Sequence, residues 1–333
     1  RLRNDIAPKS HSQEGNHRKH QNDVAAYIPK CMKRNKVSTN GKVILTWINK
    51  KLNPEQKSAV VRILSGEARP LPYIIYGPPG TGKTVTVVEA ILQIFMVRCD
   101  SRILVTTPSN SSADLIVERL HNSNQIGFGD LARLNAMQRL EDSIPEIVRP
   151  FCFSNSDAEV LLKVVRHRIV VATCDTSGGI YKLGLTQGHF SHCFIDEAGE
   201  TTEPQSMIPI GLLGMGQQNE SQIILAGDPK QLGPVLQSKV ASNCGLEESY
   251  LERLSKISLY ERDESRFGDH GNYDPVLCTK LIRNYRSHEN ILSIPSASSI
   301  IAPPASIVKS LNVDTLGIAA SLPLVISFFQ LGI

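Results

Sequence analysis

A glycine-rich loop at positions 77–84, between two apolar segments, has the spacing of a phosphate-binding site. Glycines let the backbone approach phosphate oxygens closely, and the free amides at the start of a following helix attract negative charge. Within the pattern GxxxxGK[ST], Lys83 supplies an amine for the β- and γ-phosphates and Thr84 a hydroxyl for Mg²⁺. The sequence therefore predicts a site for a nucleoside triphosphate with Mg²⁺. The loop consists of Gly77, Pro78, Pro79, Gly80, Thr81, Gly82, Lys83 and Thr84.

Two adjacent carboxylates follow the apolar run at 193–195. Asp196 is predicted to join the Mg²⁺ shell, and Glu197 is predicted to orient and deprotonate an attacking water. Two acids after a strand are also common as a solvated strand end, so their predicted role depends on the phosphate loop. Together, the loop and the carboxylates predict hydrolysis of the bound triphosphate.

Short apolar, β-rich runs must position these residues, because each run is followed by a turn and a helical stretch. Nearly continuous apolar strands of this kind indicate a parallel sheet covered by helices on both faces, hence an α/β fold. A helix is expected to open at Asn53-Pro54. The predicted strands lie at 73–77, 102–107, 168–173, 193–197 and 222–227.

The stretch from about 121 to 167 interrupts this alternation. It contains LARLNAMQRL and SDAEVLLKVV, whose apolar spacing indicates two or more helices. We therefore predict a helical insertion in the sheet domain.

Charge and composition divide the 333-residue chain into segments. Residues 1–51 hold 12 Lys and Arg against 3 Asp and Glu, whereas the remainder holds 24 against 29, so residues 1–40 are predicted to be a basic polar arm or the end of an upstream domain. The sheet domain is expected over 41–292, followed by a Ser/Pro-rich linker at 293–320. One further strand, at 321–329, predicts that a truncated second domain begins within 321–333.

The seven cysteines include no CxxC pair, and the N-terminus has no apolar signal core. Both features favour an intracellular protein with reduced thiols, without a zinc module. Residues 315–333 have no charged side chain but include Pro323 and two glycines, so we interpret them as a buried strand rather than a membrane span.

Three further motifs follow a fixed order around the phosphate loop: LNPEQ at 52–56, LAGDPKQL at 225–232 and LIRNYRSH at 281–288. This ordered set resembles that of superfamily 1 helicases. The motifs TTPSNSSAD, VVATCDTSG and DEAGETTEPQ resemble those of the Upf-like group. The motif DEAG followed by EP resembles that of the Armitage branch of RNA helicases, which act in small-RNA silencing. The resemblance covers about residues 45–292 and implies a RecA-like fold, the N-terminal motor half of such an enzyme.

The resemblance implies ATP as the nucleotide and assigns roles to four more residues. Gln56 would read the adenine edge, Tyr285 would stack on the adenine, and Arg286 would meet the γ-phosphate. Gln231 would sense the γ-phosphate and link the nucleotide state to the nucleic acid. The implied catalytic set is Glu197, Asp196, Lys83, Gln231 and Arg286.

The resemblance also places single-stranded RNA across the ends of other strands. Ser109, Asn110 and Thr173 would donate hydrogen bonds to RNA phosphates without reading the base sequence. From the residues alone, the same side chains are helix caps. Argonaute- or Piwi-type silencing proteins are the implied partners, no membrane is expected, and the predicted location is the cytoplasm and its ribonucleoprotein granules.

Two functional interpretations remain open from the sequence. The first is the motor domain of an ATP-dependent RNA helicase, expected to be weakly active alone because no second motor domain with its arginine is recognised. The second is a truncated, non-catalytic ATP- or RNA-binding module or interaction fragment.

Overall fold

The computed structural model describes residues 36–37, 43–214 and 221–286. All of them belong to one compact unit, which extends to His288. The predicted basic arm, the linker at 293–320 and the strand at 321–329 lie outside the described residues.

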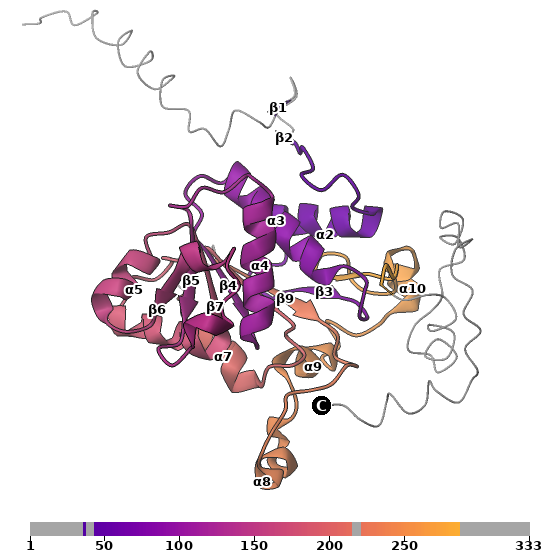
Figure 1. The fold of residues 1–333 in the computed structure, drawn as a ribbon. Helices are drawn as coiled ribbons and strands as arrows, with labels where there is room; N and C mark the ends of the chain where they lie inside the picture. The colour runs from indigo at the N-terminus through magenta and orange to yellow at the C-terminus, as the bar shows by residue number, and fades with distance from the viewer. Residues whose placement is uncertain (1–35, 38–42, 215–220, 287–333) are drawn as a thin grey trace, which may run out of the picture. The chain divides into compact units, whose positions relative to one another are not determined.

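An eight-stranded, all-parallel sheet forms the centre of this unit (Figure 1). Its strand order is β10-β3-β9-β8-β4-β7-β5-β6. The five predicted strands are β3, β4, β7, β8 and β9, whose side chains are almost all buried because helices cover both faces. The α/β, RecA-like fold is therefore confirmed. The strands are β3 (Tyr73–Tyr76), β4 (Ile103–Thr107), β5 (Leu131–Asn135), β6 (Cys152–Ser154), β7 (Ile169–Thr173), β8 (His192–Asp196), β9 (Gln222–Gly227) and β10 (Cys278–Lys280).

The helices pack in layers against this sheet (Figure 1). Helix α3 lies between α2 and α4 and also contacts β8 and β9, so it is buried along most of its length. Helix α7 contacts β8 and α9. The helices are α2 (Pro54–Ser65), α3 (Lys83–Val97), α4 (Asn110–Asn122), α5 (Ala158–Val164), α6 (Cys174–Ser177), α7 (Glu203–Gly211), α8 (Lys239–Ala241), α9 (Tyr250–Ser255) and α10 (Glu264–Phe267).

Shorter elements connect these helices and strands. The short helices are η2 (Glu141–Ser143), η3 (Arg149–Phe151), η4 (Gly178–Leu183), the π-turn η5 (Ser242–Leu246) and η6 (Gly268–His270). Before the sheet domain, β1 (Lys36–Val37) and β2 (Val43–Ile44) form an antiparallel pair.

The prediction of a helical insertion at about 121–167 is wrong. The run LARLN is strand β5, which pairs with β7 and with β6, so this region extends the sheet instead of interrupting it. Only the second predicted helix exists, as α5. Leu131 and Leu134 have a spacing that suits a helix equally well, and pairing with the neighbouring strand decides the outcome.

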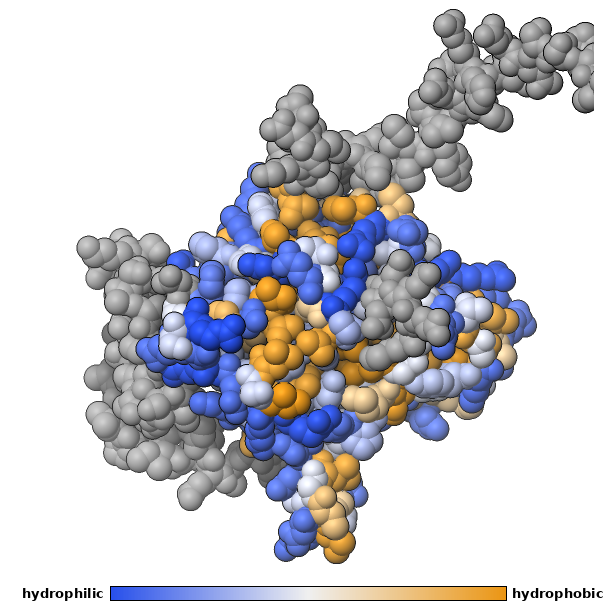
Figure 2. All heavy atoms as spheres, turned by 180° about the vertical axis from the view of Figure 1, so that it is seen from behind, coloured by the Kyte–Doolittle hydropathy of each residue, from blue (hydrophilic) through white to orange (hydrophobic). Residues whose placement is uncertain are grey.

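The surface and the cysteines complete the description. No helix in the described ranges is long and apolar enough to cross a membrane. Seen from behind, polar side chains surround a central patch of apolar ones (Figure 2). The prediction of reduced thiols is wrong for Cys99, which is disulfide-bonded. The free cysteines in the described part are Cys152, Cys174, Cys193, Cys244 and Cys278.

Candidate nucleotide-binding site and nucleic-acid edge

The phosphate loop joins the end of β3 to the first turn of α3. Gly80 and Gly82 have φ angles of +79° and +86°, a region that favours glycine. A Cβ on Gly82 would lie 2.5 Å from Gln56 Nε2, and one on Gly80 would lie 2.7 Å from the Cβ of Arg286. Since no side chain caps α3, its first amides remain free to bind an anion. The loop thus has the backbone that the motif requires.

Lys83 lies at the start of α3 and is half-buried beside the loop. Its amine donates hydrogen bonds to the carbonyl oxygens of Gly77, at 2.5 Å, and of Pro78, at 3.3 Å. Burial lowers the pKa of Lys83, and the carboxylates of Asp228, Asp196 and Glu197 oppose this shift. The carboxylates therefore offset part of the cost that burial places on the charged form of this amine, the form that binds phosphate.

Asp196 ends β8 and is 2% exposed. Burial raises its pKa to about 6, while a hydrogen bond from the Thr84 side chain acts in the opposite direction. The Glu197 amide also donates to Asp196 Oδ1 at 3.1 Å. Hard oxygen donors are the ligands that Mg²⁺ prefers, and it commonly takes one or two carboxylates with substrate phosphates. The pair Thr84 and Asp196 therefore fits Mg²⁺ bound to a nucleotide.

Glu197 follows directly and has an unusual backbone. Its φ angle is +59°, in the left-handed region, which costs a non-glycine residue about 1–3 kcal/mol. The Ser112 hydroxyl of α4 donates to Glu197 Oε2 and holds the carboxylate in place. Ser112 was not predicted as a site residue, although it lies inside the motif TTPSNSSAD. Only the fold brings it to the end of β8.

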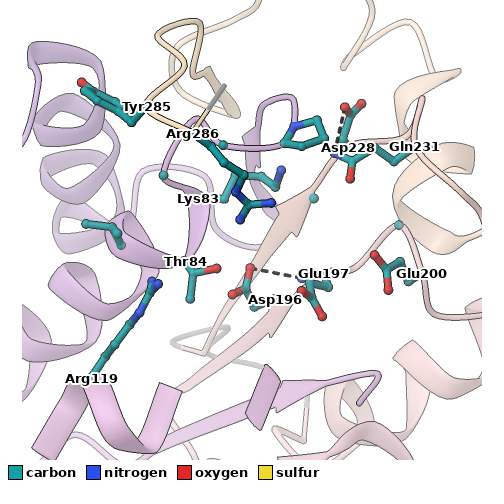
Figure 3. A pocket seen from close by; sticks show the side chains of 16 residues that line it. Lys83, Thr84, Arg119, Asp196, Glu197, Glu200, Asp228, Gln231, Tyr285 and Arg286 are labelled. Carbon is teal, nitrogen blue, oxygen red and sulfur yellow. Dashed lines mark hydrogen bonds between the residues drawn. The ribbon is translucent and has the colours of Figure 1, made fainter. Parts of the chain in front are cut away.

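These groups surround one cavity of about 380 Å³ (Figure 3). In this view the guanidinium of Arg286 points toward Asp196, and the side chain of Lys83 lies beside it. Gln231 lies on the opposite wall, where its amide donates to Asp228 Oδ2 at 3.0 Å. The predicted phosphate, metal and water residues are thus brought together from β3, β8, β9 and the segment after β10.

Arg119 of α4 and Glu200 also line the cavity and were not predicted as site residues. Burial and the neighbouring Glu197 raise the pKa of Glu200. Arg119 adds a cation on the side of Thr84 (Figure 3). Glu200 lies inside the motif DEAGETTEPQ but was given no role there, whereas Arg119 lies outside every quoted motif and is identified only by the assembled cavity.

The predicted adenine residues lie beside the loop but have different surroundings. Gln56 is buried in α2, accepts from the Asn53 amide at 3.0 Å and donates to the Thr81 carbonyl at 3.2 Å. It therefore ties α2 to the phosphate loop and does not line the cavity. Tyr285 does line it, and its hydroxyl accepts from Asn53 Nδ2 at 3.0 Å. Adenine recognition by this pair stays a prediction.

The predicted RNA residues meet at the ends of β4 and β7, which pair in parallel. Ser109 caps α4 and accepts from the Ser112 amide at 3.1 Å, and Thr173 caps α6 and accepts from the Thr176 amide at 3.3 Å. Asn110 accepts from the buried Arg133 at 2.8 Å. The capping role is present in the structure, and RNA contact by these residues stays a prediction.

Comparisons with known proteins agree with this geometry. A family model described as an AAA domain matches residues 51–159 and 155–239. Human RNA helicase Mov10l1 is 50% identical over 252 residues, which are 76% of this chain and 20% of that protein. The probable RNA helicase armi of Drosophila melanogaster is 41% identical over 272 residues, 76% of this chain and 23% of that protein.

One further relative and one solved structure extend the comparison. The putative helicase mov-10-B.1 of Danio rerio is 43% identical over 250 residues, 73% of this chain and 24% of that protein. The chain thus spans about a fifth to a quarter of the length of these relatives. The UvsW helicase from bacteriophage T4 has a TM-score of 0.37 and 14% identity over 70% of this chain and 65% of its own, which is too distant to support any argument. The chain therefore belongs to the AAA domain family of Upf-like superfamily 1 RNA helicases, and its sequence is similar to the Armitage branch.

Proposed function

We propose that this chain is the ATP-hydrolysing motor domain of an RNA helicase, which couples hydrolysis of Mg·ATP to movement along single-stranded RNA. One observation carries the proposal. The amine of Lys83, the metal-binding pair Thr84 and Asp196, and the carboxylate of Glu197 all face one cavity. The family membership of the chain supports the same assignment. The isolated phosphate loop would be compatible with many ATPases, whereas the complete cavity matches the ordered helicase motifs.

The side chains divide the reaction among themselves. Lys83 and the free amides of α3 would hold the β- and γ-phosphates, and Thr84 and Asp196 would hold Mg²⁺, which would supply positive charge to the phosphates. Glu197 orients the attacking water and accepts its proton. Arg286 reaches the same cavity and can stabilise charge on the γ-phosphate in the transition state.

Gln231 supports the coupling step of the proposal. Its amide donates to Asp228, and both residues lie in the loop directly after β9. Loss of the γ-phosphate would change the contacts of Gln231 and thereby the position of this loop. RNA phosphates would lie at the ends of β4 and β7, where the caps of α4 and α6 present amides and hydroxyls.

The biological setting belongs to the same proposal. The similarity to the Armitage branch supports a role in small-RNA silencing, with Argonaute- or Piwi-type partners, in the cytoplasm and its ribonucleoprotein granules. The sequence-independent character of the proposed RNA contacts suits an enzyme that moves along a strand.

Single-turnover hydrolysis tests the chemical step. ATP labelled in the γ-phosphate is mixed with excess protein and Mg²⁺, and released phosphate is followed with Glu197→Gln as the blank. Phosphate formation above that blank supports the proposal, and equal rates would leave only the non-catalytic interpretation.

The affinity for RNA in two nucleotide states tests the coupling step. A labelled oligouridine is titrated with the chain saturated by Mg·ADP or by a non-hydrolysable ATP analogue. Different affinities support coupling, and identical affinities would contradict it.

A further inference from the structure

A second cavity of about 380 Å³ lies at the opposite end of the sheet from β6, between the edge strands and α9. The side chains of Ile74, Tyr76 and Cys278 form its floor, because alternate residues of β3 and β10 face the same side of the sheet. Tyr260 and Tyr273 close it from the segment between α9 and β10. None of the residues assigned to the ATP site lines this cavity.

Aromatic rings form one wall of the cavity. The rings of Tyr76 and Tyr273 meet edge to face, with centroids 5.7 Å apart. Tyr260 is anchored, since its hydroxyl donates to the Pro72 carbonyl at 2.8 Å. Within the described part of the chain, by contrast, the hydroxyls of Tyr76 and Tyr273 form no hydrogen bond. The wall therefore combines ring surface with two hydroxyls that are available to a ligand.

Positive charge gathers beside these rings. Lys280 Nζ lies 5.8 Å from the ring centroid of Tyr76 and 5.9 Å from that of Tyr273. Lys230 and Arg262 line the cavity itself. Burial lowers the pKa of Lys280, and the positive charges of Arg262 and Lys230 lower it further.

The nearby carboxylates are already engaged and do not neutralise this charge. Glu252 forms an ion pair with Lys256 at 2.8 Å. Asp228 accepts from the Lys230 amide and from Gln231, each at 3.0 Å. Among the residues that the structure describes, neither Lys280 nor Lys230 forms an ion pair with a carboxylate. Arg262 pairs with Glu264 at 3.1 Å, so of the three cations only Lys280 and Lys230 have no carboxylate partner among the described residues. The cavity therefore favours an anion beside these two lysines.

We infer that this cavity binds one nucleotide unit, with its base against the half-buried ring of Tyr273 and its phosphate between Lys280, Lys230 and Arg262. A planar base suits the aromatic wall, and a phosphate suits Lys230 and Arg262 in the lining together with Lys280 beside the two rings. The volume lies near the lower end of the range of about 300–1,000 Å³ that is usual for small-ligand sites, which suits a single nucleotide. The unit can be a free nucleotide or one residue of an RNA strand.

Equilibrium titration of uridine monophosphate tests this inference. Saturating Mg·ADP is present throughout, so that the phosphate loop does not contribute to the signal. Lys280→Gln is expected to weaken binding about tenfold, because a charged hydrogen bond is lost. Tyr273→Ala is expected to weaken it about tenfold, because base stacking is lost. Lys239→Gln, on the exposed helix α8, removes the same charge elsewhere and is expected to have no effect.

Three probes distinguish the source of the nucleotide and its chemistry. Binding of uridine monophosphate that both cavity variants weaken supports a free nucleotide, and the same sensitivity seen only with a tetrauridine RNA supports a strand residue. Binding of inorganic phosphate as tight as that of the nucleotide would overturn the role of the rings. Equal affinities for wild type and Lys280→Gln, with both uridine probes, would overturn the site.

A second variant keeps the test valid if Lys280→Gln does not fold. Arg262 has a side chain that is 57% exposed, so Arg262→Gln can be made without disturbing the core. It is expected to weaken binding of the same probe severalfold, and an unchanged affinity would count against the site. Because every titration reads the uridine probe rather than ATP turnover, failure of the motor proposal would leave these results interpretable.

Discussion

Two regions at the carboxyl ends of the parallel strands differ in how they use polar side chains. At the ends of β3, β8 and β9, charged groups from five segments face one cavity. At the ends of β4 and β7, by contrast, the hydroxyls of Ser109 and Thr173 cap the helices that follow them. The ATP region is therefore recognisable from geometry alone, whereas the RNA region is built from groups that also have a local structural task.

A buried ion network explains part of this difference. Arg133 of β5 is fully buried and donates to Asp114 at 3.0 Å, and Arg139 reaches the same carboxylate at 2.5 Å. Asn110 accepts from Arg133, so its side-chain oxygen points toward this network. A buried charge without partners strongly destabilises a protein. By accepting from the buried Arg133, Asn110 therefore has a structural task at the start of α4.

The largest effect is expected at the catalytic carboxylate. Glu197→Gln keeps the shape of the side chain but cannot accept a proton, so single-turnover hydrolysis should fall about 10²–10⁴-fold. ATP affinity should be unchanged, because Lys83 and Asp196 remain. Glu261→Gln, an exposed matched control, should hydrolyse ATP like wild type. Hydrolysis by Glu197→Gln at the wild-type rate would remove Glu197 from the mechanism.

Asp substitutions separate the capping role from RNA contact. Aspartate caps helices as well as serine does, so Ser109→Asp should keep the thermal stability. The added negative charge should repel an RNA phosphate and weaken oligouridine binding about tenfold. Thr173→Asp is the parallel test at α6, and Asp142→Asn, an exposed surface change, is the control. Unchanged RNA affinity in both Asp variants would show that these residues are caps only.

Opposite pKa shifts at the two ends of β8 give a measurable pH effect. Burial lowers the pKa of His192 to about 3 and raises that of Asp196 to about 6. Between about pH 4 and 6 the unfolded state binds more protons at His192, whereas the folded state binds more at Asp196. As pH falls, the histidine lowers the free energy of unfolding and the aspartate raises it, so the two contributions largely cancel.

His192→Asn should remove this cancellation. Relative to wild type, its free energy of unfolding should increase by about 1 kcal/mol for each pH unit lowered within the window from pH 6 to 4. Asp196→Asn should show the opposite trend. Denaturant titrations at pH 6, 5 and 4 measure both differences. Parallel pH profiles for all three proteins would contradict the assigned shifts.

The smallest effect concerns the link between the two regions at the carboxyl ends of the strands. Ser112 accepts from Ser109 at 2.9 Å and donates to Glu197, so one hydroxyl connects the cap of α4 with the catalytic carboxylate. Ser112→Ala should lower the hydrolysis rate about threefold to fivefold and leave ATP affinity unchanged, since it loosens only the position of Glu197.

Ser112→Thr tests whether the hydroxyl itself matters, because it retains that group. It should restore the rate, whereas a structural defect would not be rescued. An unchanged hydrolysis rate in Ser112→Ala would show that the cap of α4 and the catalytic carboxylate are not linked through Ser112.

The features predicted best from the sequence are those that depend on residues close together along the chain. The five long apolar strands, the loop at 77–84 and the acids that end β8 lie where their local patterns place them. The helical prediction for 131–140 was wrong, because a five-residue strand depends on its pairing with β7. Strand β10 was not predicted, since three residues carry too little periodicity to be recognised.

The site residues that were not predicted from the sequence were missed for a physical reason. Ser112 reaches Glu197, and Arg119 reaches the ATP cavity, only after α4 has packed against the end of β8. The cavity that contains Tyr76 and Tyr273 likewise depends on contacts between residues about 200 positions apart. Such juxtapositions leave no periodic signal in one sequence.

Calorimetric titration of Mg·ATP into wild type, Lys83→Ala and Lys182→Ala tests the central claim most directly. Lys182 is exposed on η4, so its substitution controls for the loss of a positive charge. Because Lys83 supplies the charged hydrogen bonds to the β- and γ-phosphates, its substitution should weaken binding about 100-fold, while Lys182→Ala should bind like wild type. Equal affinity of all three proteins for Mg·ATP would contradict the assignment of this cavity to the nucleotide.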